Sequence, residues 1–252
     1  MDEARFVELL VELHKGLPRL GPGNAESTLR ALNLCVHLPD APDVLDIGCG
    51  SGVQTLILAR AAKGCITATD LIPEFLVQLK AFVSKAGLQQ RVRVCQADMN
   101  NLPFADATFD LVWSEGAAYI MGIDNALAAW RRLLRPRGYL VVSEACWFKP
   151  DPPEELKAFW AEGYPAMRGI VPNLDAARRL GWETIANFHL PTEGWTVDYY
   201  RPLKIRLPGF REAYAGDSDA QELADMTEYE MSIIERYPDF CGYEFFILRR
   251  GD

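Results

Sequence analysis

Short apolar runs alternate with longer amphipathic segments along the chain from Asp43 onward. A short β-branched run is typical of a buried strand, and an apolar period of about 3.6 residues is typical of a helix. The predicted strands are 44–47, 65–70, 92–97, 111–114 and 139–144, with helices at 53–62, 73–86 and 125–134 between them. Regular alternation of strand and helix predicts an α/β fold with a mostly parallel sheet and right-handed crossovers.

Two further strands are predicted near the end of the chain, at residues 183–190 and 243–249. The segment 191–241 between them contains a predicted helix at 220–236. An insertion of this length within a compact domain is typically functional, so we expect it on the substrate side of the fold. Residues 1–42 precede the first strand and are expected to form an N-terminal helical cap.

The composition is that of an ordinary globular protein, with 49% hydrophobic residues among 252. No repeat or linker-like stretch divides the chain, so a single domain over residues 1–252 is predicted. A net charge of -9 disfavours nucleic acid and other partners bound mainly through phosphates, which leaves a small-molecule substrate. We further expect no membrane span, a cytoplasmic location and, from three dispersed histidines, no metal site. A homodimer stays open as the assembly state.

A glycine-rich turn follows the first predicted strand in the sequence VLDIGCGSG. Gly48, Gly50 and Gly52 carry no Cβ that would keep a ligand from the backbone, and the helix that follows adds free N–H donors. The turn is a candidate site for a nucleotide-like cofactor, with a tight structural turn as the alternative. Its spacing, G-x-G-x-G, differs from the G-x-G-x-x-G of dinucleotide sites, which disfavours an NAD-dependent oxidoreductase.

Acidic side chains lie at the carboxyl ends of the next predicted strands, where open α/β sheets bind ligands. Asp70 ends the second strand at the distance from the glycine turn where a carboxylate accepts hydrogen bonds from ribose hydroxyls. Asp98 and Met99 follow the third strand and are candidates for contact with an adenine, although a methionine is also common core filler. Ser114 and Glu115 end the fourth strand, where a carboxylate would suit a cationic cofactor.

The ordered motifs VLDIGCGSG, TATDL, QADMNNLPF, FDLVWSEGA and LLRPRGYLVVSE resemble those of class I S-adenosylmethionine-dependent methyltransferases, especially the ubiquinone and menaquinone biosynthesis group. The resemblance implies a Rossmann-like, seven-stranded sheet of order 3-2-1-4-5-7-6, with helices on both faces and the last strand antiparallel. It implies S-adenosyl-L-methionine as cofactor, with the glycines at its methionine portion, Asp70 at its ribose, and Asp98 with Met99 at its adenine. The full set of candidate cofactor-binding residues is Asp46, Gly48, Gly50, Gly52, Asp70, Leu71, Asp98, Met99, Ser114 and Glu115.

These features predict a methyltransferase that transfers a methyl group to a small molecule by in-line displacement. Alignment and exclusion of water supply much of the catalysis of such a reaction, so a dedicated catalytic side chain is optional. If a general base is needed, the candidates are Glu115, Glu144 and His189, with a structural role as the alternative for His189. A cofactor-binding sensor or scaffold without catalysis stays open as an alternative function.

Four large aromatic side chains are candidates for the wall of an acceptor pocket. Trp147 follows the fifth predicted strand, and Trp195, Tyr199 and Tyr200 belong to the segment 191–241. Their faces could exclude water and hold a cation, or could simply pack the segment onto the sheet. Residues 19–24 are predicted to form either a lid over the cofactor, with Asn24 capping the next helix, or a plain connector.

Overall fold

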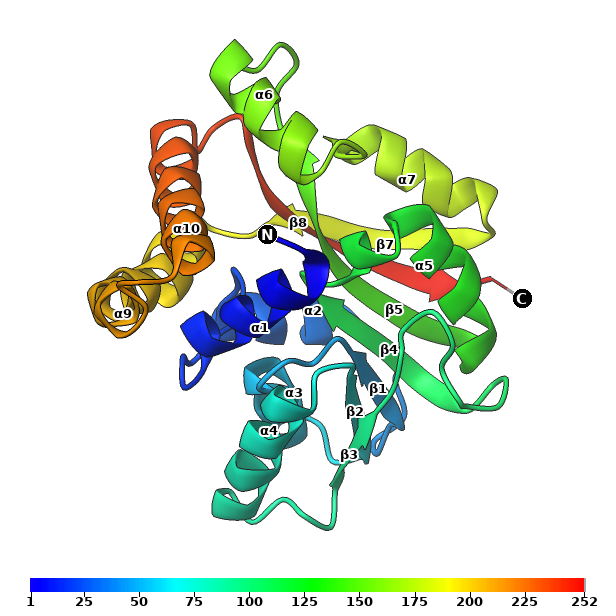
Figure 1. Cartoon of the computed structure of the whole chain (residues 1–252). Helices are drawn as coiled ribbons and strands as arrows, with labels where there is room; N and C mark the ends of the chain where they lie inside the picture. The colour runs from blue at the N-terminus through cyan, green and yellow to red at the C-terminus, as the bar shows by residue number, and fades with distance from the viewer. Residues whose placement is uncertain (252) are drawn as a thin grey trace.

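The computed structural model describes residues 1–251, in which helices cover both faces of one sheet (Figure 1). Its main strands lie in the order β3-β2-β1-β4-β5-β8-β7. β8 runs antiparallel to both of its neighbours, and the other pairs are parallel. Because β7 and β8 are the sixth and seventh predicted strands, the predicted Rossmann-like order 3-2-1-4-5-7-6 is confirmed. A two-residue strand, β6, also pairs with β5 and was not predicted.

Every predicted strand is present, and the largest difference is in β5. The strands are β1 Val44–Ile47, β2 Ile66–Asp70, β3 Val92–Gln96, β4 Phe109–Glu115, β5 Leu134–Trp147, β6 Arg168–Gly169, β7 Trp182–His189 and β8 Cys241–Arg250. The helix predicted at 125–134 ends at Trp130, and a 3₁₀ turn leads directly into β5. Pro136 cannot donate a backbone hydrogen bond to a helix, which favours this early end.

Local signals explain where several helices begin. The helices are α1 Glu3–His14, α2 Ala25–Asn33, α3 Val53–Ala61, α4 Pro73–Lys85, α5 Ile123–Trp130, α6 Glu154–Gly163, α7 Ile170–Arg179, α8 Glu193–Trp195, α9 Arg201–Ala213 and α10 Ser218–Arg236, with short helices η1 Ala118–Ile120, η2 Arg131–Leu133 and η3 Thr196–Tyr200. The Asn24 side chain accepts a 2.7 Å hydrogen bond from the Ser27 amide, which confirms Asn24 as the cap of α2. Pro73 occupies the first turn of α4, where its missing N–H costs nothing.

Alternating side chains of the central strands build two hydrophobic cores, one on each face of the sheet. On β5, Tyr139 and Val141 belong to the core on the side of α1 to α4, whereas Leu140 and Val142 belong to the core under α5 and α7 (Figure 1). This alternation follows from the two-residue period of a strand. The parallel strands are therefore covered on both sides, which leaves their carboxyl edge as the accessible part of the sheet.

The N-terminal helix and the segment 191–241 pack against each other, and α1 lies beside α9 and α10 (Figure 1). The Tyr199 hydroxyl and His14 Nε2 are 3.0 Å apart, and Arg5 forms an ion pair with Asp217. The segment thus rests partly on α1 rather than on the sheet alone. Within the part of the chain that the structure describes, no helix has both the length and the apolar character needed to cross a membrane.

Candidate functional site

A cavity of about 650 Å³ lies at the carboxyl ends of β1 to β4. This volume lies in the usual range for small-molecule pockets. Its wall combines the glycine turn and the ends of β2, β3 and β4 with parts of α1 and the segment before α2. The cavity therefore lies where the sequence predicted a cofactor site.

The glycine turn forms one wall of this cavity through Gly48 and Gly50. Their φ angles are +67° and +53°, which a residue with a side chain rarely adopts. A Cβ on Gly50 would lie 2.7 Å from Leu20 Cδ1, and one on Gly48 would lie 2.5 Å from Ala117 Cβ. Gly52 differs, because it does not line the cavity and its missing Cβ makes room for Leu79 of α4. Side chains at these positions would clash with Leu20 and Ala117, and the bare backbone of Gly48 and Gly50 forms a cradle at the cavity wall.

Asp70 connects the end of β2 to the glycine turn. Its Oδ2 accepts a 2.8 Å hydrogen bond from the Gly50 amide, and its Oδ1 accepts a 2.9 Å bond from the Ile72 amide. Burial raises the pKa of this carboxyl, and these hydrogen bonds act in the opposite direction. Asp70 lines the cavity together with Leu71, which is exposed. Since a carboxylate oxygen accepts more than one hydrogen bond, Asp70 can still receive ligand hydroxyls.

Asp98 and Met99 line the cavity from the loop after β3. Asp98 Oδ1 accepts hydrogen bonds from the amide and the side chain of Asn100, which lower the pKa of the Asp98 carboxyl. Its second oxygen remains available as an acceptor. A Cβ on Gly48 would lie 3.6 Å from Met99 Cε, so the Met99 side chain is next to the glycine turn.

Glu115 lines the cavity but is held by three protein donors. Its Oε1 accepts hydrogen bonds from Thr28 Oγ1 at 2.7 Å and from Trp113 Nε1 at 3.0 Å, and its Oε2 lies 3.3 Å from Arg19 Nη1. The Glu115 and Arg19 side chains are only 3% and 8% exposed. The Arg19 counter-charge and the two further donors give Glu115 a structural role, which argues against a role as general base. It holds residues 19–24 against the sheet, where Leu20 contacts the glycine turn.

Asp46 and Ser114 lie outside the cavity wall, within the sheet. Asp46 Oδ2 accepts a 2.6 Å hydrogen bond from Thr55 at the start of α3, while its buried Oδ1 has no protein partner. Burial raises the pKa of the Asp46 carboxyl to about 7. The hydroxyl of Ser114 is also buried without a partner. Both side chains are buried because helices cover both faces of the sheet at β1 and β4.

The structure places His189 away from the cavity, at the end of β7. Its Nδ1 pairs with the buried Glu244, and its ring stacks on Phe148 with 4.1 Å between centroids. β7 is the outermost strand and lies four positions from β1 in the sheet order, so His189 is far from the glycine turn. The sheet order implied by the family resemblance already placed this strand at the outer edge, but the local pattern around His189 did not show its distance from β1.

The four predicted aromatic wall residues do not line the cavity. Trp147 borders a separate depression near α6, and Trp195, Tyr199 and Tyr200 are buried. Trp195 packs on Tyr243 with 4.9 Å between ring centroids, and Tyr199 packs on Tyr200 at 5.2 Å. For these three residues, the geometry favours the packing alternative.

Several wall residues escaped the sequence analysis. α1 contributes Phe6, Val7 and Leu10, and η1 contributes Tyr119. Their sequences carry no motif, and an apolar stripe on α1 gives no sign of whether it meets the core or a ligand. Only the tertiary position of α1, beside α9 and α10 and at the cavity, reveals their place.

Glu144, a candidate base, lies on β5 with only 2% exposure. Neither carboxylate oxygen has a hydrogen-bond partner. The nearby Tyr164 hydroxyl lowers the pKa of this carboxyl, although the contact does not reach hydrogen-bond geometry. Burial raises the pKa of Glu144 to about 7, so the group can take up or release a proton near neutral pH.

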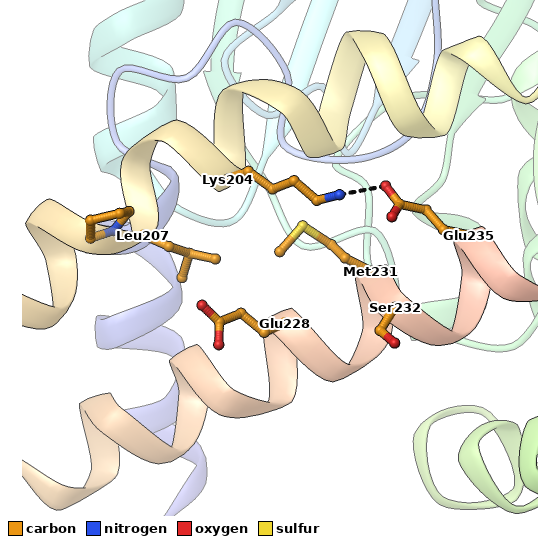
Figure 2. A pocket seen from close by; sticks show the side chains of 7 residues that line it. Lys204, Leu207, Glu228, Met231, Ser232 and Glu235 are labelled. Carbon is orange, nitrogen blue, oxygen red and sulfur yellow. Dashed lines mark hydrogen bonds and ion pairs between the residues drawn. The ribbon is translucent and has the colours of Figure 1, made fainter.

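A smaller depression lies between α9 and α10 (Figure 2). Its charged groups are already paired, because Lys204 Nζ lies 2.6 Å from Glu235 and Glu228 pairs with Arg211. It therefore has no free charge on these residues with which to select a ligand. Across residues 1–251, no group of three or more His, Cys, Asp and Glu side chains is placed to hold a metal ion.

Comparison with known proteins gives matches over the glycine turn and the strands that follow. Residues 44–138 match a protein-family model described as a methyltransferase domain. The uncharacterized methyltransferase YodH of Bacillus subtilis is 30% identical over 154 residues, which are 61% of this chain and 64% of that protein. The chain spans 37% to 64% of the length of the first curated relatives that it matches.

Solved structures share the fold over nearly the whole chain. A SAM-dependent methyltransferase from Geobacter sulfurreducens, in complex with S-adenosyl-L-homocysteine, superposes with a TM-score of 0.80 at 22% identity, over 96% of this chain and 97% of that one. The [4+2]-cyclase SpnF superposes with a TM-score of 0.78 at 21% identity, over 97% of this chain and 92% of that one. These similarities support the Rossmann-like architecture.

Proposed function

We propose that the protein is an S-adenosylmethionine-dependent methyltransferase that acts on a small molecule. The observation that carries this proposal is the cradle of Gly48 and Gly50 above a cavity that Asp70 and Asp98 also line. The methyltransferase-domain match covers all of these residues. The ubiquinone and menaquinone subgroup, the cytoplasmic location, the absence of a nucleic-acid partner and the assembly state stay predictions.

The residues at the cavity fit this methyl donor. The cradle admits a ligand to the backbone of Gly48 and Gly50, which would hold the methionine portion. The Asp70 carboxylate would accept from the ribose hydroxyls, and Asp98 and Met99 would contact the adenine. When bound, the donor supplies a methyl group on a positively charged sulfur, which already favours displacement.

The protein's own part in the reaction is alignment and exclusion of water. The Glu115 and Arg19 pair holds the segment 19–24 as a cover over the glycine turn, so we assign Glu115 a positioning role. Glu144 does not line the cavity and is only 2% exposed, so this proposal needs no dedicated general base. His189 has no such role in this proposal, because Glu244 already holds it away from the cavity.

The alternative of a cofactor-binding protein without methyl transfer has one specific observation in its favour. SpnF shares the fold over 97% of this chain and is named a [4+2]-cyclase, so the fold alone does not establish the reaction. An NAD-dependent oxidoreductase remains disfavoured by the glycine spacing.

The test combines binding with turnover. Calorimetry should show one S-adenosylmethionine bound per chain, and incubation with a pooled small-molecule library should release S-adenosylhomocysteine, detected by mass spectrometry. Absence of binding would refute the proposal. Binding without product from any acceptor would favour the non-catalytic alternative.

A further inference from the structure

The part of the cavity wall that α1 and η1 form is apolar. α1 contributes Phe6, Val7 and Leu10, and η1 contributes Tyr119 and Ile120. We call these five residues the apolar wall. Val7, Tyr119 and Ile120 are exposed although their side chains are large and mainly hydrophobic. Single exposed apolar side chains are ordinary on a globular protein, whereas a group of them around a cavity is typical of a ligand site.

The apolar wall continues from the place proposed for the methionine portion of the donor. A Cβ on Gly48 would lie 2.5 Å from Ala117 Cβ, and η1 begins at the next residue. Asp70 and Asp98, the proposed contacts of the ribose and adenine, come from the end of β2 and from the loop after β3 instead. A molecule on the apolar wall would therefore lie next to the part of the donor that carries the methyl group.

The charged groups around the cavity are already paired or assigned. Among the side chains that the structure describes, the charged ones that line the cavity are those of Arg19, Asp70, Asp98 and Glu115. Arg19 and Glu115 form a buried ion pair with each other, and Asp70 and Asp98 are the proposed partners of the donor. No charge remains on these four residues for a second molecule. A charged acceptor would thus lose its hydration without gaining a counter-charge.

Tyr119 supplies the polar group of the apolar wall. Its ring packs against that of Tyr164 with 5.7 Å between centroids, which holds the side chain beside the cavity. A phenol is protonated and neutral near pH 7. Its hydroxyl can donate one hydrogen bond and accept another, which suits an uncharged polar group on a ligand.

We propose that the methyl acceptor is an uncharged molecule with an apolar body, which packs against Phe6, Leu10, Tyr119 and Ile120. The inference rests on the proposed function and adds the chemical class of the acceptor. Apolar binding grows with the area removed from water, so each buried methylene should strengthen it about two- to fourfold. An ammonium or a carboxylate of the same shape should bind more weakly.

The first test compares uncharged and charged molecules of the same size on protein saturated with S-adenosylhomocysteine, with dissociation constants measured by NMR titration. One series is benzyl alcohol, benzylammonium and benzoate, and the other is 1-hexanol, hexylammonium and hexanoate. In at least one series, the alcohol should bind about tenfold more tightly than both ions. 1-Hexanol should also bind about fourfold more tightly than 1-butanol, or better, because it has two more methylenes.

The second test asks whether the apolar wall holds these alcohols. Ile120→Ser should weaken the binding of the tighter alcohol about fivefold and leave the affinity for S-adenosylhomocysteine unchanged. Ile205→Ser is the matched control and should keep both affinities, because Ile205 of α9 does not line the cavity. Ile120 and Ile205 are 61% and 76% exposed, so neither substitution removes core packing.

The outcomes separate the two proposals. An ion that binds as tightly as its alcohol in both series, no binding of either alcohol, or no gain from 1-butanol to 1-hexanol overturns the assignment of an uncharged, apolar acceptor. An equal effect of Ile120→Ser and Ile205→Ser on the alcohol, or a weaker affinity of Ile120→Ser for S-adenosylhomocysteine, overturns it as well. Failure of the wild type to bind S-adenosylhomocysteine refutes the proposed function instead.

Discussion

Replacing Glu115 by glutamine should destabilise the folded protein and loosen the segment that covers the glycine turn. The isosteric amide keeps an oxygen that can accept from Thr28 and Trp113, so the change removes mainly the charge interaction with Arg19. Arg19 is 8% exposed and its Nη2 already lacks a partner. The variant therefore leaves a buried guanidinium without its counter-charge.

The expected size of this effect follows from the geometry. For unit charges 3.3 Å apart, Coulomb's law at an effective dielectric constant of about 20 gives about 5 kcal/mol of attraction. Measured losses on breaking one side of a buried pair are about 3–5 kcal/mol, part of which is the cost of the stranded charge. We expect Glu115→Gln to lower the free energy of unfolding by about 3 kcal/mol, and Arg19→Met to restore part of it in the double variant.

Urea unfolding of the wild type, both single variants and the double variant yields the coupling energy, which we expect to be about 2–3 kcal/mol. The matched control is Asp43→Asn with Arg135→Met, because that pair is 49% and 41% exposed and should couple by less than about 1 kcal/mol. A coupling energy at Arg19 and Glu115 no larger than that of this surface pair would refute the conclusion that the buried pair holds residues 19–24 in place. A general-base role for Glu115 would instead show as a changed pH-rate profile with unchanged stability.

Three further predictions concern the cavity wall. Asp70→Asn should weaken S-adenosylmethionine binding by about 1–3 kcal/mol through loss of charge-assisted hydrogen bonds, and unchanged affinity by calorimetry would remove Asp70 from the site. Gly50→Val should abolish that binding while the protein stays folded by circular dichroism, because its Cβ would lie 2.7 Å from Leu20 Cδ1 in the space over the turn; normal binding would make the turn purely structural. The pKa of Glu144 is raised from 4.5 to about 7, so its contribution to stability is fully present below about pH 4.5 and is lost as the pH rises through 7. Glu144→Gln should remove this loss, so that between pH 5 and pH 8 its free energy of unfolding in urea rises by up to about 3 kcal/mol relative to wild type. A parallel pH dependence of both proteins would contradict the raised pKa.

The sequence by itself predicted the sheet order through the family resemblance. Local periodicity predicted the type and the approximate range of each strand and of the helices between them. It also located Asp70 and Asp98 at the cavity, because a side chain just after a parallel strand reaches the carboxyl edge whatever surrounds it. The same reasoning misplaced His189, since β7 also ends at the carboxyl edge but is the outermost strand, four positions from β1, as the sheet order implied by the resemblance already required. Local pattern does not encode that lateral distance.

The tertiary structure alone decided which remote side chains meet. Glu115 contacts Arg19, 96 residues away in the chain, and Tyr243 of the last strand lies beside Gly116, just after the fourth strand. Trp195 faces the interior, where it packs on Tyr243 of β8 and on Tyr200. Such contacts depend on how helices and strands pack in three dimensions, and no period or spacing within a single element records them.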